Sequence, residues 1–267
     1  MPRGRLFIAA GLVVAAAAVF TVLVAGSSGS DDGDLLPDLD QAAPGGLSGR
    51  TGGTFAKPRF FLGFESAAGN VGEGPLVILG SRRSRNEARM RVVQRIDHAN
   101  GATSTEPIRP TLRYVRSAGH AHWHLLGFMR YELRRAGKVV RPDRKTGFCL
   151  GDRYRLKLTL ERTPPTPSFP EECGKNGPGR VRVQEGISVG YGDDYDAHVE
   201  GQEFDVTSLP AGRYVLVHRV NSGRLLRESD YENNAASLAF DLTWPRGMKL
   251  SPRVDVVGRC PQTATCP

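Results

Sequence analysis

Three histidines at alternate positions form the strongest chemical pattern in the chain. They are His120, His122 and His124, half of the six histidines that the protein contains. In a β-strand, alternate side chains point to the same face, so the three imidazoles would lie side by side. A cluster of imidazoles without cysteine suits copper, zinc, iron or nickel rather than calcium or magnesium. The spacing therefore predicts a transition-metal site at these three residues.

The residues around the histidines predict the element that positions them. A strand running from residue 120 to residue 133 would have an apolar opposite face, made of Ala121, Trp123, Leu125, Gly127, Met129, Tyr131 and Leu133. That face can pack into a core while the imidazoles occupy the other side. The outer two Cα atoms would be roughly 13 Å apart in a flat strand, so the outer rings must lean inward or the strand must bend. Gly119 would permit such a bend.

Short alternating segments recur along the chain and predict the rest of the architecture. They cover residues 60–65, 75–80, 89–97, 154–160, 202–206, 213–220 and 237–244. Glycine, proline and asparagine separate them, and no long amphipathic helix competes with them. Residues 163–179 hold five prolines and predict a long loop. We therefore expect an all-β fold, a β-sandwich with long loops, over residues 56–267.

The N-terminal segment predicts export. An uncharged run from Leu6 to Ala25 follows two arginines and precedes acidic residues 31–34. Twenty apolar residues can span a bilayer, and the charges place the C-terminal side outside. We expect residues 1–26 to be a transmembrane signal anchor, with a cleaved signal peptide as the alternative. Residues 27–55 are rich in Asp, Gly, Ser and Pro and predict a flexible linker.

The cysteines and the charge distribution indicate which kinds of protein and partner fit this sequence. In an exported domain the four cysteines are expected to form disulfides. Three pairings are open, and the pairing that closes the shortest loops is Cys149–Cys173 with Cys260–Cys266. The net charge is +8, but the arginines are scattered from one end of the chain to the other. A nucleic-acid surface would instead gather basic and aromatic residues on one face, so we expect no nucleic-acid partner.

Four segments, taken together, resemble the lysyl oxidase family in the shorter form found in bacteria. They are the three histidines at 120–124, the run Lys-Thr-Gly-Phe-Cys-Leu-Gly-Asp at 145–152, the segment 194–207, and Val220-Asn221 followed by Glu-Ser-Asp-Tyr-Glu-Asn-Asn at 228–234. They stand in the order of the family. Two features depart from it: the lead-in at 113–119 lacks the family's Trp-rich, Cys-containing sequence, and Phe204 stands near the position of a family tryptophan.

The resemblance implies a cofactor and a reaction. In the family, copper is bound by the three histidines, and a lysine tyrosylquinone forms from the protein's own lysine and tyrosine, which match Lys145 and Tyr195. The quinone would form a Schiff base with a primary amine, possibly a peptidyl lysine, and yield an aldehyde. Molecular oxygen would then regenerate the quinone, with release of ammonia and peroxide. The implied protein is a copper-dependent amine oxidase, membrane-anchored or secreted.

The cofactor residues have competitors. Lys145 could be a solvated loop charge, and Tyr191 competes with Tyr195, although spacing to Gln202 favours Tyr195.

The catalytic base is open as well. Asp205 is the candidate, with Asp194 and Asp196 as alternatives. A copper-binding module that lacks the quinone is the rival function, and an adhesion-type β-sandwich without metal is a second rival. A peptide in which Lys145 and Tyr195 are crosslinked would separate the enzyme from both rivals.

Overall fold

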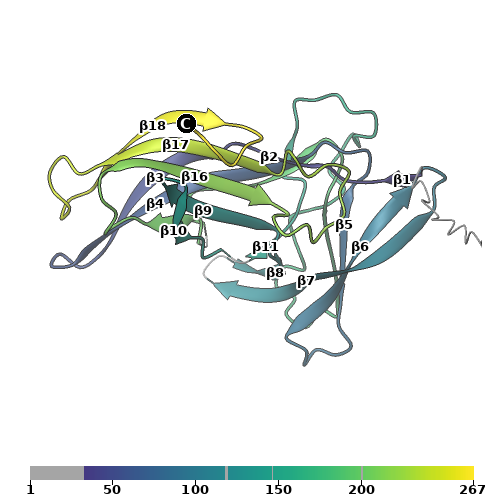
Figure 1. Ribbon diagram of the computed structural model, residues 1–267. Coiled ribbons are helices and arrows are strands. Elements are labelled where there is room, and N and C mark those ends of the chain that lie inside the picture. The colour runs from purple at the N-terminus through teal and green to yellow at the C-terminus, as the bar shows by residue number, and fades with distance from the viewer. Residues whose placement is uncertain (1–32, 118–119, 146, 200) are drawn as a thin grey trace, which may run out of the picture. The chain divides into compact units, whose positions relative to one another are not determined.

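A computed structural model describes residues 33–267 except 118, 119, 146 and 200, and at 117 and 120 it describes the backbone alone (Figure 1). Its 18 strands form three antiparallel sheets, and no helix occurs among the described residues. The all-β class is therefore confirmed, although the strands pair into three sheets where a sandwich would have two. The expected N-terminal span lies outside the described residues. Within those residues, no helix is long and apolar enough to cross a membrane.

The first sheet carries the histidines. Its strand order is β11-β8-β7-β6-β5-β13, with β1 paired to β6. The strands are β1 (Asp34–Leu35), β5 (Leu76–Ser81), β6 (Arg89–His98), β7 (Thr103–Ser117), β8 (His120–Leu126), β11 (Gly147–Phe148) and β13 (Arg182–Ile187). Strands β7 and β8 form a hairpin in which Val115 faces His122.

The second sheet has the order β10-β9-β16-β17-β18, and the third has the order β12-β14-β4-β15, with β2 and β3 also paired to β4. The second contains β9 (Met129–Arg135), β10 (Lys138–Pro142), β16 (Gly212–Val220), β17 (Ala235–Thr243) and β18 (Arg253–Cys260). The third contains β2 (Leu39–Gln41), β3 (Gly45–Gly53), β4 (Pro58–Asn70), β12 (Tyr154–Arg155), β14 (Tyr191–Tyr195) and β15 (Glu203–Asp205).

One contiguous apolar cluster joins the three sheets. Its largest fully buried side chains include Phe64, Trp123, Tyr131, Tyr214 and Phe240. These residues come from all three sheets, as the alternating sequence pattern predicts for strands with one buried face. The three sheets therefore share one core.

The histidine segment differs from the single strand that its pattern predicted. Strand β8 ends at Leu126, and Gly127 follows with a φ of 78°, a conformation that glycine adopts without a steric cost. Strand β9 then begins at Met129 in the second sheet. The apolar alternation survives the break, because Trp123, Leu125, Met129, Tyr131 and Leu133 are all buried. One pattern thus supplies two sheets, and Gly127 turns the chain from one to the other.

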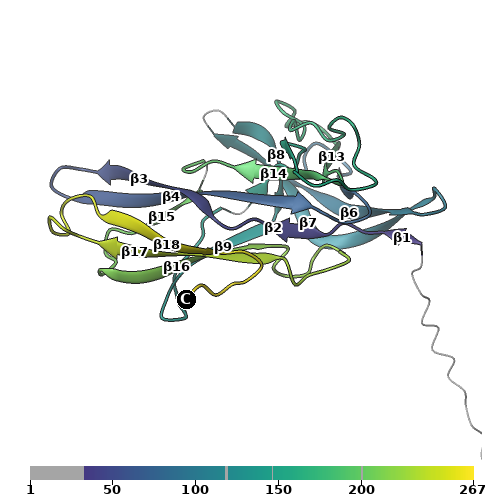
Figure 2. The same cartoon turned by 90° about the horizontal axis from the view of Figure 1, so that it is seen from above.

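The predicted linker is the second difference. Residues 34–53 contain β1, β2 and β3, and β2 and β3 pair with β4 (Figure 2). Leu39 is fully buried. The compact unit runs from Gly33 to Pro267, so it begins before the expected boundary at residue 56. Strands β2 and β3 are held to β4 by backbone hydrogen bonds, which do not depend on a run of apolar side chains. Their composition, rich in Asp, Gly, Ser and Pro, therefore predicted a linker.

Other strands were shorter than predicted or missed altogether. The segment 154–160 forms only the two-residue strand β12, and residues 163–179 form a loop as predicted. Strands β13, β14 and β18 had no counterpart in the sequence reading. Strand β14 reads Tyr-Gly-Asp-Asp-Tyr, a composition depleted in strand-forming residues. Tertiary packing against β4 decides its structure instead.

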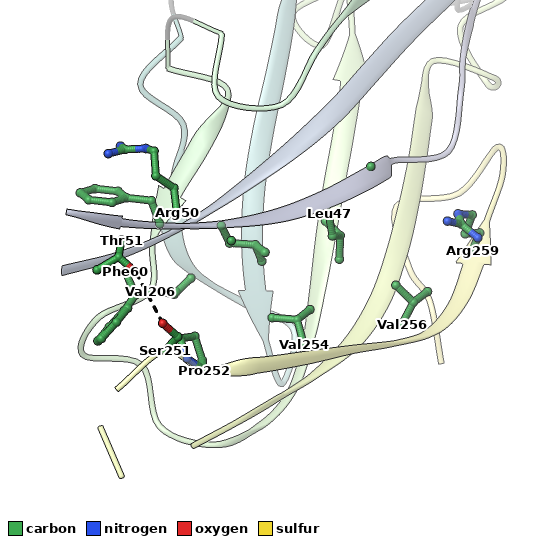
Figure 3. Close-up of a pocket in the computed structure, with 14 residues that line it drawn as sticks. Leu47, Arg50, Thr51, Phe60, Val206, Ser251, Pro252, Val254, Val256 and Arg259 are labelled. Atoms are coloured by element: carbon green, nitrogen blue, oxygen red, sulfur yellow. Dashed lines mark hydrogen bonds between the residues drawn. The ribbon is translucent and has the colours of Figure 1, made fainter. Parts of the chain in front are cut away.

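A groove of about 490 Å³ separates the edge strands β3 and β18. Figure 3 shows Leu47, Val254 and Val256 pointing into it, and Arg259 near one end. Near the other end, the hydroxyls of Thr51 and Ser251 form a 3.4 Å hydrogen bond. None of its lining residues belongs to β8, so the groove is separate from the histidines.

Candidate active site

A pocket of about 300 Å³ brings three of the sequence motifs together. Its walls come from β8, from the segment after β10, and from β14 with the turn that follows it. The lining residues are His122, His124, Lys145, Cys149, Arg153, Asp194, Tyr195, Asp196 and Val199. Segments 70 residues apart in the sequence thus meet at one site.

Two of the three predicted metal ligands have described side chains. The ring centroids of His122 and His124 lie 4.7 Å apart, on the face of β8 opposite Trp123. His120 lies on the same strand, opposite Ser117, but its side chain is not among those described. Among the described side chains, no group of three His, Cys, Asp or Glu residues could hold a metal ion. Two neighbouring imidazoles at i and i+2 still form a donor set that suits copper.

Gly147 explains why His124 occupies this place. Strand β11 pairs with the end of β8, with Gly147 opposite Leu126. A Cβ atom at residue 147 would lie 2.7 Å from the Cβ atom of His124 and 3.1 Å from its Nδ1 atom. Only glycine lets the two backbones approach this closely. The glycine of the second motif therefore packs against a histidine of the first.

Lys145 and Tyr195 lie against each other inside the pocket. The Nζ atom of Lys145 is 4.2 Å from the centroid of the Tyr195 ring and 5.1 Å from that of Phe148. Lys145 is 5% exposed and Tyr195 is 8% exposed. Lys145 is therefore not a solvated loop charge. Tyr191 does not line the pocket, because its hydroxyl donates to the carbonyl of Pro164.

The buried Asp193, paired with the half-buried Arg153, holds the hydroxyl end of Tyr195. The hydroxyl donates to Oδ2 of Asp193 over 2.6 Å, and the carbonyl oxygen of Cys149 is a second acceptor at 3.0 Å. Arg153 donates from Nε to Oδ1 of Asp193 over 2.5 Å. Burial raises the pKa of Asp193 to about 7 against the opposing effect of Arg153, and burial together with Asp193 raises the pKa of Tyr195.

The disulfides have the pairing that closes the shortest loops. Cys149 is bonded to Cys173, and Cys260 is bonded to Cys266. The first bridge closes the loop that carries Glu171, which binds Nη1 of Arg153 over 2.8 Å. It therefore anchors one wall of the pocket. Disulfides are typical of proteins outside the cytoplasm, as the predicted export requires.

The predicted base is not brought to this pocket. Asp205 lies on β15, where it pairs with Arg59 and accepts hydrogen bonds from Thr207. Burial tends to raise its pKa, but Thr207 and Arg59 hold the pKa below its usual value. Asp194 and Asp196, the alternatives, both line the pocket.

Two residues of the site, Arg153 and Asp193, were not predicted from the sequence. Arg153 directly follows the Lys145–Asp152 motif and had no signal of its own among thirty arginines. Asp193 directly precedes the base candidate Asp194, and composition alone does not distinguish it from Asp194 and Asp196. The alternation in β14 distinguishes them, because residues 193 and 195 are buried while residue 194 is exposed. If residues 191–195 had been predicted as a strand, the alternation would have placed Asp193 on the same face as Tyr195.

A second pocket of about 270 Å³ adjoins the first through Tyr195. The two pockets share Asp194, Tyr195 and Asp196, and Glu65 adds a further carboxylate to the second. The remaining wall consists of small residues from β4 and from the segment between β2 and β3. These carboxylates make the surroundings of Tyr195 acidic in a protein whose net charge is +8.

Comparison with known proteins gives one family. The lysyl oxidase family model matches residues 80–246. Protein-lysine 6-oxidase of Sus scrofa is 28% identical over 173 residues, which are 61% of this chain and 62% of the relative. The Gallus gallus protein of the same name is 28% identical over 56% of this chain and 32% of its own length. Lysyl oxidase homolog 1 of Homo sapiens is 30% identical over 54% of this chain and 23% of its own. The match thus spans between about a quarter and three-fifths of these relatives.

Proposed function

Because this chain belongs to the lysyl oxidase family, we propose that it is a copper-dependent amine oxidase that converts primary amines to aldehydes with O₂. The quinone cofactor would form from Lys145 and Tyr195. The observation that carries this proposal is the distance of 4.2 Å between the Lys145 nitrogen and the Tyr195 ring, in a pocket that His122 and His124 also line.

The residues of the pocket have separate roles in this proposal. His120, His122 and His124 would hold the copper ion. When bound, copper would supply, with oxygen, the oxidising power that converts Tyr195 and Lys145 to a quinone able to accept electrons from an amine. The protein holds the Lys145 amine over the ring and excludes water from both side chains by burial. Holding the two groups in contact makes their reaction effectively unimolecular.

We propose Asp194 as the proton acceptor in turnover, in place of Asp205. Asp194 lines both pockets, whereas Asp205 lines neither. Partial desolvation raises the pKa of the Asp194 carboxyl, partly opposed by Arg153, which makes the carboxylate a stronger base than one with the usual pKa. Asp196, the third candidate, shares both pockets and would contribute negative charge.

The substrate in this proposal is a cationic primary amine outside the cytoplasm. Glu65, Asp194 and Asp196 would attract it toward Tyr195 although the molecule as a whole is basic. Steering of this kind depends on the local field rather than on net charge. The relatives named protein-lysine 6-oxidase make a peptidyl lysine the first amine to test.

Peptide mass spectrometry of protein produced with copper and oxygen tests the proposal. We expect a crosslinked peptide that joins Lys145 to Tyr195, with the mass of the quinone form and sensitivity to phenylhydrazine. Tyr191→Phe is the matched control and should crosslink as the wild type does, whereas Tyr195→Phe should not.

Two other outcomes would contradict the proposal. Unmodified Lys145 and Tyr195 peptides in copper-loaded protein would indicate a copper-binding module without the quinone. Protein that takes up no copper at stoichiometric occupancy would indicate an adhesion-type domain.

A further inference from the structure

We propose that Asp193 is a catalytic residue of cofactor formation, which holds the Tyr195 hydroxyl and accepts its proton, and that Arg153 positions Asp193 for this role. The inference rests on the proposed reaction between Lys145 and Tyr195. It concerns a residue outside the histidine, lysine and tyrosine set that the sequence motifs contain.

Burial of Asp193 is the first observation. Its side chain is 0% exposed, and a carboxylate in such a position is costly unless charged or hydrogen-bonding partners compensate for the lost water. Asp193 and Tyr195 are two residues apart on β14, so their side chains point to the same face. The shorter side chain thus reaches the hydroxyl of the longer one, with 2.6 Å between Oδ2 and the phenol oxygen.

Arg153 fixes the orientation of the carboxylate. Its Nε atom donates to Oδ1 of Asp193, which leaves Oδ2 for the phenol. The guanidinium carbon of Arg153 is also 5.1 Å from the centroid of the Tyr195 ring. Glu171 and the carbonyl oxygen of Cys149 accept hydrogen bonds from the other two nitrogens of Arg153. The arginine therefore ties Asp193 to the disulfide-closed loop.

The arrangement around the phenol also determines where its proton goes. The hydroxyl has one proton and two acceptors, the Asp193 carboxylate and the Cys149 carbonyl oxygen. Only the carboxylate can become protonated at neutral pH. In the first one-electron oxidation of Tyr195, the phenol O–H bond breaks, an O–H bond forms at Oδ2 of Asp193, and one electron leaves the ring for O₂, which is reduced to superoxide. The oxidant is the one that the proposed function already uses.

The same hydrogen bonds would set the orientation of the ring. With its hydroxyl held at one end, Tyr195 presents a face to Lys145, whose nitrogen lies 4.2 Å from the ring centroid. Without Asp193, the phenol would retain only the neutral carbonyl acceptor, and its position relative to Lys145 would vary more. Proximity effects on rate are sensitive to displacements of about 1 Å.

Asp152, which precedes Arg153 in the loop closed by the Cys149–Cys173 disulfide, offers a matched control. It is also buried, at 7% exposure, and its oxygens accept hydrogen bonds from the backbone of Ser168, Phe169 and Ser188 and from the Ser188 hydroxyl. Within the described residues, none of these hydrogen bonds involves Tyr195. Asp152→Asn thus reports the effect of removing a buried carboxylate from this region without touching the phenol.

The test compares Asp193→Asn, Asp193→Ala, Arg153→Met, Arg153→Lys and Asp152→Asn with the wild type in the full chain. For each folded, copper-loaded protein, the crosslinked Lys145–Tyr195 peptide is followed by mass spectrometry after oxygen is admitted. We expect Asp193→Ala to slow crosslinking about 100-fold, the scale of a lost proton acceptor. Arg153→Met should also slow it, Arg153→Lys should restore part of the rate, and copper content and the Asp152→Asn rate per folded molecule should stay unchanged.

A second readout needs neither copper nor crosslinking. In copper-free protein labelled with ¹³C at the tyrosine Cζ atom, the Tyr195 signal is identified with Tyr195→Phe. We expect this signal to move in Asp193→Asn, which has the same shape as the wild type, and to stay in place in Asp152→Asn. If the wild type never crosslinks, the proposed function fails, and this signal still decides whether Asp193 holds the Tyr195 hydroxyl. An unmoved signal in Asp193→Asn, or wild-type crosslinking in Asp193→Ala, would overturn the inference.

Discussion

At the scale of single residues, the hydrogen-bond partners of a buried carboxylate indicate whether it stabilises the fold or belongs to the site. The fourth sequence motif contains Glu228, which is 4% exposed and accepts hydrogen bonds from the Leu39 amide, the Asn221 side chain and the Asn234 side chain. It ties β2 to the loop between β16 and β17 and lies outside the site pocket. This motif therefore shapes a turn, as its Asn and Asp content predicts.

The pH dependence of stability should report this buried glutamate. Burial raises the pKa of Glu228 to about 7 against the hydrogen bonds from Asn221 and Asn234. Because the pKa of Glu228 is higher in the folded state than in the unfolded state, its protonated form contributes to the free energy of unfolding. This contribution is fully present below the unfolded-state pKa near 4.5 and is lost as pH rises through 7. The loss is about 3 kcal/mol at most. Urea unfolding at pH 5 and pH 8 should show a smaller pH effect in Glu228→Gln than in the wild type.

Glu232→Gln is the control for that measurement. Its side chain is 89% exposed, so its pH effect should match that of the wild type. Equal pH effects in Glu228→Gln and Glu232→Gln would contradict the assignment.

At the scale of elements, the close approach of β11 to β8 links two sequence motifs. The alternation in β8 could be predicted, because Trp123 and Leu125 are strongly apolar and the histidines alternate with them. The turn at Gly127 could not, because the apolar period continues unchanged through it. The pairing of β11 with β8 could not either, because two residues carry no pattern and only the packing of Gly147 on His124 determines it.

Substitution of Gly147 by alanine tests this packing. The added methyl group would overlap His124, so we expect displacement of that ring and a loss of roughly 1–3 kcal/mol in the free energy of unfolding. Copper affinity, measured by competition with a chelator, should fall by about tenfold or more, which corresponds to about 1.4 kcal/mol. Gly49→Ala, in β3 with open space at the Cβ position, should leave copper affinity unchanged. A Gly147→Ala protein with wild-type copper affinity would show that His124 is not held by β11.

At the scale of the whole molecule, the N-terminal strands belong to the folded unit. Leu39 is fully buried, the Gln41 amide donates to the carbonyl of Asn233, and β3 pairs with β4 over most of its length. A protein that starts at Gly33 should therefore unfold like the longer chain in urea. One that starts at residue 56 loses β1, β2 and β3, and we expect it to be less stable by several kcal/mol or unable to fold. Equal stability of the two truncated proteins would restore the linker interpretation.

The two disulfides should contribute unequally. Cys149–Cys173 spans 24 residues and Cys260–Cys266 spans 6, so loop entropy assigns roughly 3–4 kcal/mol to the first and about 2 kcal/mol to the second. Replacing each pair by alanines and measuring urea unfolding tests the order. Only the first replacement should also slow the Lys145–Tyr195 crosslink, because only the first bridge closes the loop whose Glu171 holds Arg153 and whose Cys149 carbonyl oxygen accepts from Tyr195. A larger loss from the second pair would contradict this order.

The contact between Lys145 and Tyr195 has a topological consequence. Both cysteines of the first disulfide lie between these two residues in the sequence. A covalent bond between Lys145 and Tyr195 would therefore enclose the disulfide ring within a larger ring of about 50 residues, which loop entropy values at about 4 kcal/mol. Cofactor formation would then act as a second staple on the same wall of the domain. The mature protein should therefore have a higher free energy of unfolding than its precursor.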